Sequence, residues 1–245
     1  MKHRITMNPM GLVKLRFCLG IWTILGCLSL TRGAETDGVA LAIIYDTSGS
    51  MNELVPDAAG GRTPKYVIAN RALLAVASHI ESFLTNNSSS SPRRIEAGLF
   101  VFKGNGAREA VKFGPFDAEA LKSFARDFSD PRGATPLGNA LNTAGGRVLG
   151  SSLSRKHVLI ITDGMNTLGP SPADVLPKLK QRAEAGQSGI SVHFIAFDVD
   201  AKVFASVKKM GATVVSASNE KELNSQLEFI LQKKILLEDE EPPKK

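Results

Sequence analysis

Short apolar runs alternate along the chain with longer amphipathic segments. Residues 39–45 (VALAIIY) and 157–162 (HVLIIT) are almost entirely apolar, which is typical of strands that are buried on both faces of a sheet. The apolar runs predict strands at residues 39–45, 95–102, 157–162, 190–197 and 213–216, with a short edge strand at 110–113.

Apolar residues at helical spacing predict helices between these strands. Asp117 and Asn219 are expected to cap two of them, and Glu222 completes a capping box with Asn219. Gly186 and Gly211 are expected to end two others. The predicted helices cover residues 65–84, the segment after Asp117, 136–149, 173–185, 202–210 and the segment after Asn219.

Strands that alternate with helices predict an α/β fold. The expected architecture is a Rossmann-like, doubly wound, mostly parallel sheet with helices on both faces, formed by one domain at residues 34–237. In such sheets ligands bind beyond the carboxyl ends of the strands, where the strand order reverses. The residues directly after each strand are therefore the candidates for a site. Residues 238–245 (EDEEPPKK) are charged and contain proline, so we expect a disordered tail there.

The first 33 residues differ from the rest of the chain. An apolar run at 17–30 (FCLGIWTILGCLSL) follows a basic stretch and precedes small residues, an order that predicts a secretory signal. We therefore expect a bacterial exported protein in the periplasm, outside the cell or at the membrane surface. An uncleaved anchor is one alternative, and a lipid anchor is another, because residues 24–27 resemble a bacterial lipobox that ends at Cys27. Membrane association is expected only through this segment.

The charge distribution argues against a nucleic-acid partner. The formal net charge is +6, from 30 Lys and Arg against 24 Asp and Glu. Five of the basic residues lie within the first 33, where no acidic residue occurs, so the remainder is nearly neutral and lacks the basic footprint of a nucleic-acid binder. Both cysteines, Cys18 and Cys27, lie there too. The remainder therefore has no disulfide, thiol nucleophile or zinc-thiolate site.

Small oxygen-bearing side chains follow two of the predicted strands. Asp46, Ser48 and Ser50 come after the strand at 39–45, Asp163 follows the strand at 157–162, and Thr135 precedes a helix. We expect them at one edge of the sheet, with Thr135 and Asp163 on its exposed loops, because parallel strands end at a common edge. Two carboxylates and three hydroxyls are hard oxygen ligands, which suit Mg²⁺, Mn²⁺ or Ca²⁺ and not zinc or copper.

The segment Asp46-Thr47-Ser48-Gly49-Ser50 matches the D-x-S-x-S motif of von Willebrand factor type A domains. The chain resembles that family over residues 38–237, most of all its secreted or membrane-associated bacterial members. Thr135 and Asp163 lie where the family places its remaining metal-site threonine and aspartate. Leu168 departs from some bacterial relatives, which carry a cysteine shortly after the Asp-Gly pair, so no disulfide is expected in that loop.

The resemblance implies a metal-ion-dependent adhesion site. Ser48 and Ser50 would bind the ion directly, and Asp46 would act partly through water. Thr135 and Asp163 would exchange between direct and water-mediated contact. The implied cofactor is Mg²⁺, with Mn²⁺ or Ca²⁺ as alternatives. The implied partner is a protein that presents an Asp or Glu carboxylate to the ion, in protein–protein interaction or adhesion.

An enzyme is the main rival interpretation, and the sequence argues against it. The D-x-D-x-T pattern of haloacid-dehalogenase-like phosphatases fails because Ser48 stands where the second aspartate is needed. A serine nucleophile would need a base within reach, but His79, His157 and His193 lie within a predicted helix and predicted strands. Residues 104–106 (GNG) lack the G-K-S/T of a phosphate loop.

Three interpretations therefore stay open, in descending order. The first is metal-dependent binding of a protein, with no catalytic residues. The second is a scaffold that the metal stabilises without ligand exchange, and the third is a metal-dependent hydrolase. Asp198 and Asp200 also follow a predicted strand. We expect them to form a solvated turn and a helix cap in preference to a second ion site.

Overall fold

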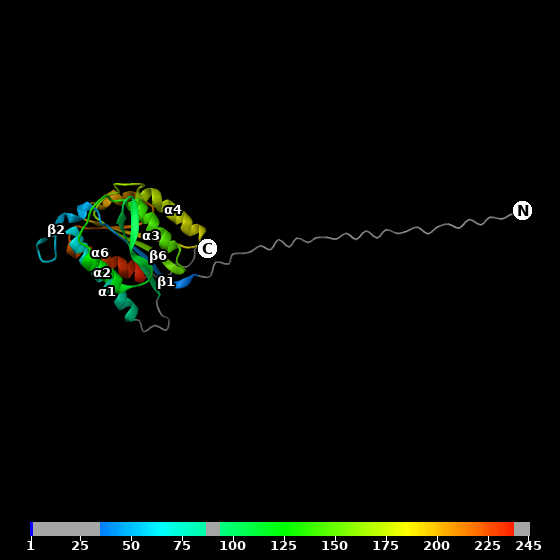
Figure 1. The fold of residues 1–245 in the computed structure, drawn as a ribbon, viewed down its shortest axis with the longest axis horizontal. Coiled ribbons are helices and arrows are strands. Elements are labelled where there is room, and N and C mark those ends of the chain that lie inside the picture. Colours follow the sequence, from blue (N-terminus) through cyan, green and yellow to red (C-terminus); the bar gives the residue numbers. More distant parts are fainter. Residues whose placement is uncertain (2–34, 87–93, 238–245) are drawn as a thin grey trace. The chain divides into compact units, whose positions relative to one another are not determined.

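The computed structural model describes Met1 and residues 35–86 and 94–237 (Figure 1). The chain divides into two units, residues 1–33 and 34–245, and all the helices and strands that the structure describes lie in the second. The predicted signal segment after Met1 and the predicted tail at 238–245 lie outside the described residues.

Six strands form one sheet in the order β5-β4-β1-β6-β7-β8. All neighbouring pairs are parallel except β4 and β5, which form an antiparallel hairpin at the edge. The predicted doubly wound, mostly parallel sheet is thus confirmed, although the edge strand is longer than expected. The strands are β1 (Thr36–Tyr45), β4 (Ile95–Lys103), β5 (Gly106–Pro115), β6 (Leu153–Thr162), β7 (Ser191–Phe197) and β8 (Thr213–Ala217).

Helices cover both faces of the sheet (Figure 1). Alternate residues of β1 point to opposite faces, so Leu41 and Ile43 pack with α1, α2 and α6, whereas Ala42 and Ile44 pack with α3, α4 and α5. By length and composition α1 could also cross a membrane, but its apolar residues pack into the core. The helices are α1 (Lys65–Thr85), α2 (Ala118–Asp127), α3 (Leu137–Leu149), α4 (Pro172–Ala185), α5 (Ala205–Lys209) and α6 (Glu220–Ile230).

The predicted helix caps are confirmed where side chains carry them. The Asp117 carboxylate accepts from the Ala120 N–H at 2.9 Å, and the Asn219 side chain accepts from the Glu222 N–H at 2.9 Å. The predicted capping box of Asn219 and Glu222 does not form, because the Glu222 carboxylate accepts from the Ser218 N–H and hydroxyl, both at 2.8 Å. The predicted helix at 202–210 is instead a 3-10 turn, η2 (Ala201–Phe204), followed by α5.

Four short elements were not expected from the pattern. They are the 3-10 turn η1 (Gly49–Asn52), the hairpin of β2 (Leu54–Pro56) and β3 (Arg62–Pro64), and the π-helical turn η3 (Leu231–Leu236). The hairpin strands have only three residues each, which is too few for an alternating pattern to be visible. The hairpin loop is held by Asp57, which accepts from the Gly61 N–H and the Thr63 hydroxyl, both at 2.8 Å.

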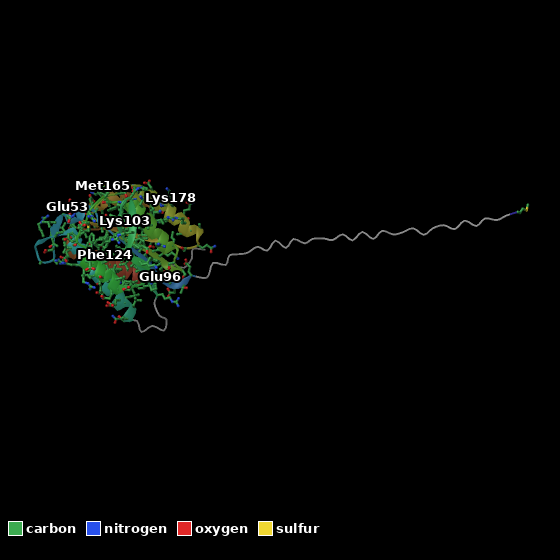
Figure 2. The ribbon with its side chains drawn as sticks, in the orientation of Figure 1. Glu53, Glu96, Lys103, Phe124, Met165 and Lys178 are labelled. Atoms are coloured by element: carbon green, nitrogen blue, oxygen red, sulfur yellow. The ribbon has the colours of Figure 1, made fainter. Side chains whose placement is uncertain are left out.

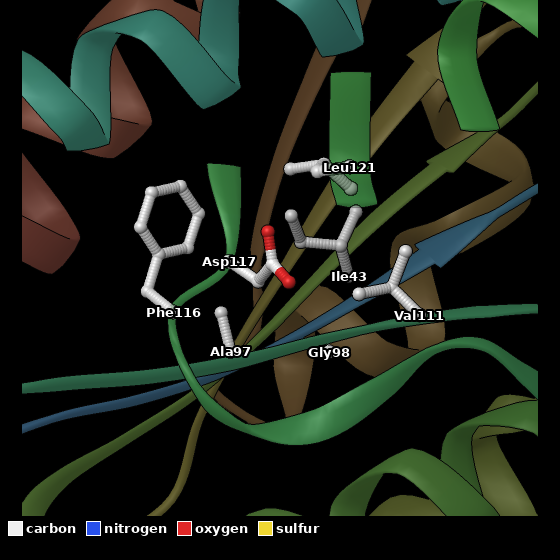
Figure 3. A pocket seen from close by; sticks show the side chains of 7 residues that line it. All are labelled: Ile43, Ala97, Gly98, Val111, Phe116, Asp117 and Leu121. Carbon is white, nitrogen blue, oxygen red and sulfur yellow. The ribbon is translucent and has the colours of Figure 1, made fainter. Parts of the chain in front are cut away.

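A small cavity lies between β4, β5 and the start of α2, with Gly98 on its wall (Figure 3). Its volume is about 10 Å³, which is at most enough for a single water molecule. A Cβ atom on Gly98 would lie 2.8 Å from the Phe113 Cα, so glycine permits the close approach of the two strands. This cavity is too small to hold a substrate or cofactor.

Two histidines form a buried pair within the sheet. His157 on β6 and His193 on β7 stack with ring centroids 5.5 Å apart, and Nδ1 of His157 lies 3.3 Å from Nε2 of His193. Burial lowers the pKa of His157 to about 3, helped by the nearby His193 and Arg155. Burial and Lys234 lower the pKa of His193 to about 4. Both are core residues within strands; the sequence favours a surface or core histidine over a catalytic base, and the structure shows that they lie in the core.

The histidine pair predicts a loss of stability in acid. The unfolded pKa is near 6.5, so between about pH 6.5 and pH 4 the unfolded chain binds more protons than the folded one. The pair's stabilising contribution is complete above pH 6.5 and is lost as pH falls through this window. Replacing His193 with Gln should reduce the loss between pH 7 and 4.5 by about 2 kcal/mol, measured by urea unfolding at both pH values. His79→Gln is the control, and an equal effect there would contradict the assignment.

Candidate metal centre

The candidate site lies where β1 and β6 end side by side. Tyr45 pairs with Ile161 in the parallel register, and the Asp46 N–H donates to the Ile161 carbonyl at 3.0 Å. The strand order reverses at β1, since β4 lies on one side of it and β6 on the other. The predicted ligands Asp46 and Asp163 therefore follow adjacent strands at the position where open α/β sheets bind ligands.

Asp46 is fully buried and holds the segment after β1 in place. Its Oδ1 accepts from the Ser48 N–H at 2.8 Å, and its Oδ2 accepts from the Thr162 hydroxyl at 2.5 Å. Burial raises the pKa of Asp46 to about 6, and the negative charge of Asp163 adds to the rise, while the hydrogen bonds act against it. Asp46 is therefore a carboxylate whose negative charge is only partly compensated by its neighbours.

Ser48, Ser50 and Asp163 extend this network. The two serine hydroxyl oxygens are 3.0 Å apart, and the Ser50 hydroxyl donates to Asp163 Oδ1 at 2.9 Å. The turn η1 brings Ser50 back toward Ser48, and the Gly49 N–H donates to the Gly133 carbonyl at 3.2 Å. Four of the five predicted ligands thus form one hydrogen-bonded cluster.

Thr135 is held beside this cluster by its backbone. Its N–H donates to the Thr167 hydroxyl at 2.9 Å, and its carbonyl accepts from the Thr167 N–H at 3.0 Å. Its Oγ1 lies 4.0 Å from where a Cβ on Gly164 would stand. Within the described residues, no hydrogen bond joins the Thr135 hydroxyl to the other four ligands. The structure therefore ties Thr135 through its backbone to the loop after Asp163, without joining its hydroxyl to the other predicted ligands.

The expected exposure of this loop edge is wrong for two of its residues. Thr135 and Asp163 expose only 4% and 6% of their surface. The physical reason is that the loops after β1 and β6 and the loop before α3 hydrogen-bond to one another and so cover these side chains. Only Ser50, which is half-buried, gives the cluster partial access to solvent.

The loop after β6 rests directly on the first turn of α3. The Gly138 N–H donates to Asn166 Oδ1 at 3.0 Å, and a Cβ on Gly138 would lie 2.0 Å from the Pro170 carbonyl oxygen. No side chain fits there unless the loop moves. Gly138 therefore sets how closely the Asp163 loop approaches the helix that follows Thr135.

Sequence reasoning missed Lys65, the first residue of α1. Its ammonium contacts Asp163 at 3.1 Å, Asp198 at 3.0 Å and Glu53 at 2.7 Å. A positively charged lysine at the N-terminus of a helix interacts unfavourably with the helix dipole. Its position in the sequence could therefore have indicated that Lys65 is kept for a role other than helix stability. Figure 2 labels Glu53, in the segment after β1, and Met165, in the segment after β6.

Asp198 and Asp200, which follow β7, have different roles. Asp200 caps η2 by accepting from the Lys202 N–H at 2.9 Å, as expected of a helix cap. Asp198 adopts a left-handed conformation with φ of 55° and pairs with Lys65 instead of forming only a solvated turn.

The donor set fits a hard divalent cation. The side-chain oxygens of Ser48, Ser50 and Asp163 are linked by hydrogen bonds, and the Asp46 carboxylate joins them through the Ser48 N–H. None of the five predicted ligands carries nitrogen or sulfur in its side chain. Within residues 35–86 and 94–237 no group of three or more His, Cys, Asp or Glu side chains could hold a metal. A cation here would therefore depend on the serine and threonine hydroxyls as well as on the two carboxylates.

The chain matches a known domain family and resembles several solved structures. A family model described as von Willebrand factor type A domain matches residues 40–230. No curated protein sequence matches significantly. Among solved structures, the PilB minor pilin from Streptococcus sanguinis has a TM-score of 0.59 at 16% identity, covering 79% of this chain and 60% of that one. This chain thus spans less than two thirds of that pilin.

Two further structures share the fold. The vWF domain of the type V pili tip protein Mfa5 from Porphyromonas gingivalis has a TM-score of 0.55 at 13% identity, covering 80% of this chain and 95% of that domain. Proximal thread matrix protein 1 from the mussel byssus, solved with a zinc occupied MIDAS motif, has a TM-score of 0.53 at 18% identity. That match covers 81% of this chain and 48% of the mussel protein.

The close contact at Gly138 predicts that this glycine cannot be enlarged. Gly138→Ala should lower the free energy of unfolding by about 1–3 kcal/mol, because the added methyl group forces the Pro170 carbonyl away. Gly146 in the same helix has no atom within 4 Å of the corresponding position. Gly146→Ala should therefore stabilise the protein by up to about 1 kcal/mol through helix propensity. Urea unfolding measures both, and a neutral Gly138→Ala would contradict the packing argument.

Proposed function

The chain belongs to the von Willebrand factor type A family, and from that premise we propose that it binds a divalent cation and, through the cation, a protein partner. The observation that carries this proposal is the hydrogen-bonded cluster of Asp46, Ser48, Ser50 and Asp163 at the reversal point of the sheet. We infer a binding function without catalysis, which agrees with the pilus and byssus proteins among its structural neighbours.

The five residues divide into neutral and charged ligands. Ser48, Ser50 and Thr135 would offer hydroxyl oxygens to the cation, and Asp46 and Asp163 would offer or orient carboxylate oxygens. When bound, the cation supplies an electrophilic centre for an anionic oxygen. The neutral hydroxyls leave part of the cation's charge uncompensated, so an Asp or Glu carboxylate of a partner is the ligand this chemistry favours.

Mg²⁺ is the cation that we propose, with Mn²⁺ or Ca²⁺ as alternatives. Oxygen-only ligands are the preference of these hard cations. The zinc-occupied motif of the mussel protein supports the wider proposal that a divalent ion can occupy a site of this fold. A site with three hydroxyls and two carboxylates would not select zinc by its donor chemistry.

We further propose that the protein acts outside the cytoplasm. The basic and then apolar order of the first 33 residues supports export. The pilin and pilus tip proteins among the structural neighbours support a place on the cell surface and a role in adhesion. The partner that we propose there is a protein that presents an Asp or Glu carboxylate.

Metal binding predicts a shift in thermal stability. A cation that binds only the folded chain stabilises it by about 2.7 kcal/mol at a hundredfold excess over Kd, so saturating Mg²⁺ should raise Tm. The double variant Ser48→Ala and Ser50→Ala should lose this rise because two hydroxyl ligands are gone. Ser123→Ala, an exposed serine of α2, is the matched control and should keep it. If none of Mg²⁺, Mn²⁺ and Ca²⁺ changes the wild-type Tm, the result would argue against the metal site.

Partner binding should depend on the Thr135 hydroxyl. A pull-down from native extract, carried out once with Mg²⁺ and once with EDTA, identifies the partner. The affinity of two Thr135 variants for that partner is then measured. Thr135→Val keeps most of the buried volume but removes the hydroxyl, and should weaken binding by about 2 kcal/mol or more, as at an interface hot spot. Thr135→Ser keeps the hydroxyl and should bind nearly as wild type. If Thr135→Val binds the partner as tightly as wild type does, or if partner binding persists in EDTA, the metal does not mediate partner binding. The protein would then be a scaffold in which the metal is structural.

A further inference from the structure

The ammonium group of Lys65 lies among three carboxylates at the edge of the sheet that carries the predicted ligands. Its Nζ is 2.7 Å from Glu53 Oε2, 3.1 Å from Asp163 Oδ2 and 3.0 Å from Asp198 Oδ2. These carboxylates follow β1, β6 and β7, so one side chain joins the segments after three strands. The Lys65 side chain is only 2% exposed, whereas Glu53 and Asp198 reach solvent at 66% and 40%.

Two effects oppose a positive charge at this position, and the carboxylates offset both. The charge lies at the first residue of α1, near the positive end of the helix dipole. Burial acts to lower the pKa of Lys65, but the hydrogen bonds to Glu53 and Asp198 and the charge of Asp163 outweigh burial and hold that pKa above its usual value. Removal of the ammonium would leave Asp163 buried beside Asp46 without a compensating charge.

Asp163 divides its two oxygens between Lys65 and the predicted ligand cluster. Its Oδ2 accepts from the Lys65 ammonium, while its Oδ1 accepts from the Ser50 hydroxyl. A divalent cation held by Ser50 and Asp163 would therefore share one carboxylate with a fixed positive charge. Inside a protein, two cations at such short range are only weakly screened from each other. The ammonium therefore opposes cation binding, and it compensates Asp163 when no cation is present.

We propose that Lys65 is an internal counter-ion that sets the cation affinity of this site and stabilises the site in its metal-free form. This inference rests on the proposed metal binding. When a cation is bound, it shares Asp163 with the ammonium, is held less tightly, and keeps more of its charge for a partner's carboxylate. Without Lys65 the site would bind its cation more tightly and would depend on that cation for stability.

The test compares Lys65→Met with wild type in the purified full chain, with Mg²⁺ alone as the probe. Met keeps most of the length of the side chain and removes the charge. Titration calorimetry should show Mg²⁺ binding about tenfold tighter, which corresponds to about 1.4 kcal/mol. The metal-free Tm should fall below that of wild type, and saturating Mg²⁺ should raise it by more degrees than it raises the wild-type Tm.

Lys122→Met is the matched control. Lys122 also bridges two carboxylates, Glu81 at 2.7 Å and Glu119 at 3.2 Å, but it contacts the far end of α1 from Lys65. Its replacement should leave Mg²⁺ affinity unchanged. An equal tightening in Lys122→Met would show that net charge alone acts, and would overturn the specific role of Lys65.

The remaining outcomes separate this inference from the proposed function. Unchanged or weaker Mg²⁺ binding by a folded Lys65→Met, with normal binding by wild type, overturns the counter-ion role alone and leaves Lys65 as a residue that only orients Asp163. Absence of binding by wild type and by Lys65→Met overturns the proposed metal site and this inference together. Binding by Lys65→Met but not by wild type supports the counter-ion role.

A second variant decides the matter if Lys65→Met does not fold. Asp198→Asn removes one carboxylate that competes for the ammonium, so more of the positive charge acts on Asp163, and Mg²⁺ binding should weaken several-fold. Asp200→Asn, which keeps the cap of η2, is the control for a nearby loss of charge. Unchanged or tighter binding by Asp198→Asn would contradict the proposal.

Discussion

Tyr45 pairs with Ile161 at the centre of the sheet, and the arrangement of the candidate site depends on this parallel register. The pairing ends β1 and β6 at the same level, so Asp46 and Asp163 start neighbouring loops at one edge. Both strands are covered by helices on both faces, and a shift by one residue would turn every core side chain to the wrong face. The whole core therefore holds these two carboxylates close together, at a cost in electrostatic repulsion.

The rest of the site can be understood as compensation for that repulsion. The Ser48 N–H and the Thr162 hydroxyl donate to Asp46, the Ser50 hydroxyl donates to Asp163, and the Lys65 ammonium takes the remaining Asp163 oxygen. Most of these donors are neutral, and hydroxyls can also accept, so the hydroxyl oxygens of this cluster have lone pairs for the cation that we propose. Lys65 differs because its charge is fixed and cannot become a ligand.

The structural neighbours show how far this architecture tolerates sequence change. A pilin, a pilus tip domain and a byssus protein share the fold at 13–18% identity. The fold persists because it requires only apolar strands and helix faces at the right spacing, which many sequences satisfy. Function belongs to the loops beyond the strand ends, and in this chain those loops carry the hydrogen-bonded cluster of Asp46, Ser48, Ser50 and Asp163.

The sequence by itself determined the order of the main strands and helices, the caps at Asp117 and Asn219, and the oxygen-bearing residues of the candidate site. Each of these leaves a local trace, such as an apolar run, a helical period or a motif after a strand. Only the tertiary structure decided the burial of Thr135 and Asp163 and the ion pairs of Lys65. Lys65 and Asp163 are 98 residues apart, and no local pattern records which distant charges meet. Their meeting follows from the packing of α1 against the ends of the strands, because a buried charge is stable only where the whole fold brings its counter-charges.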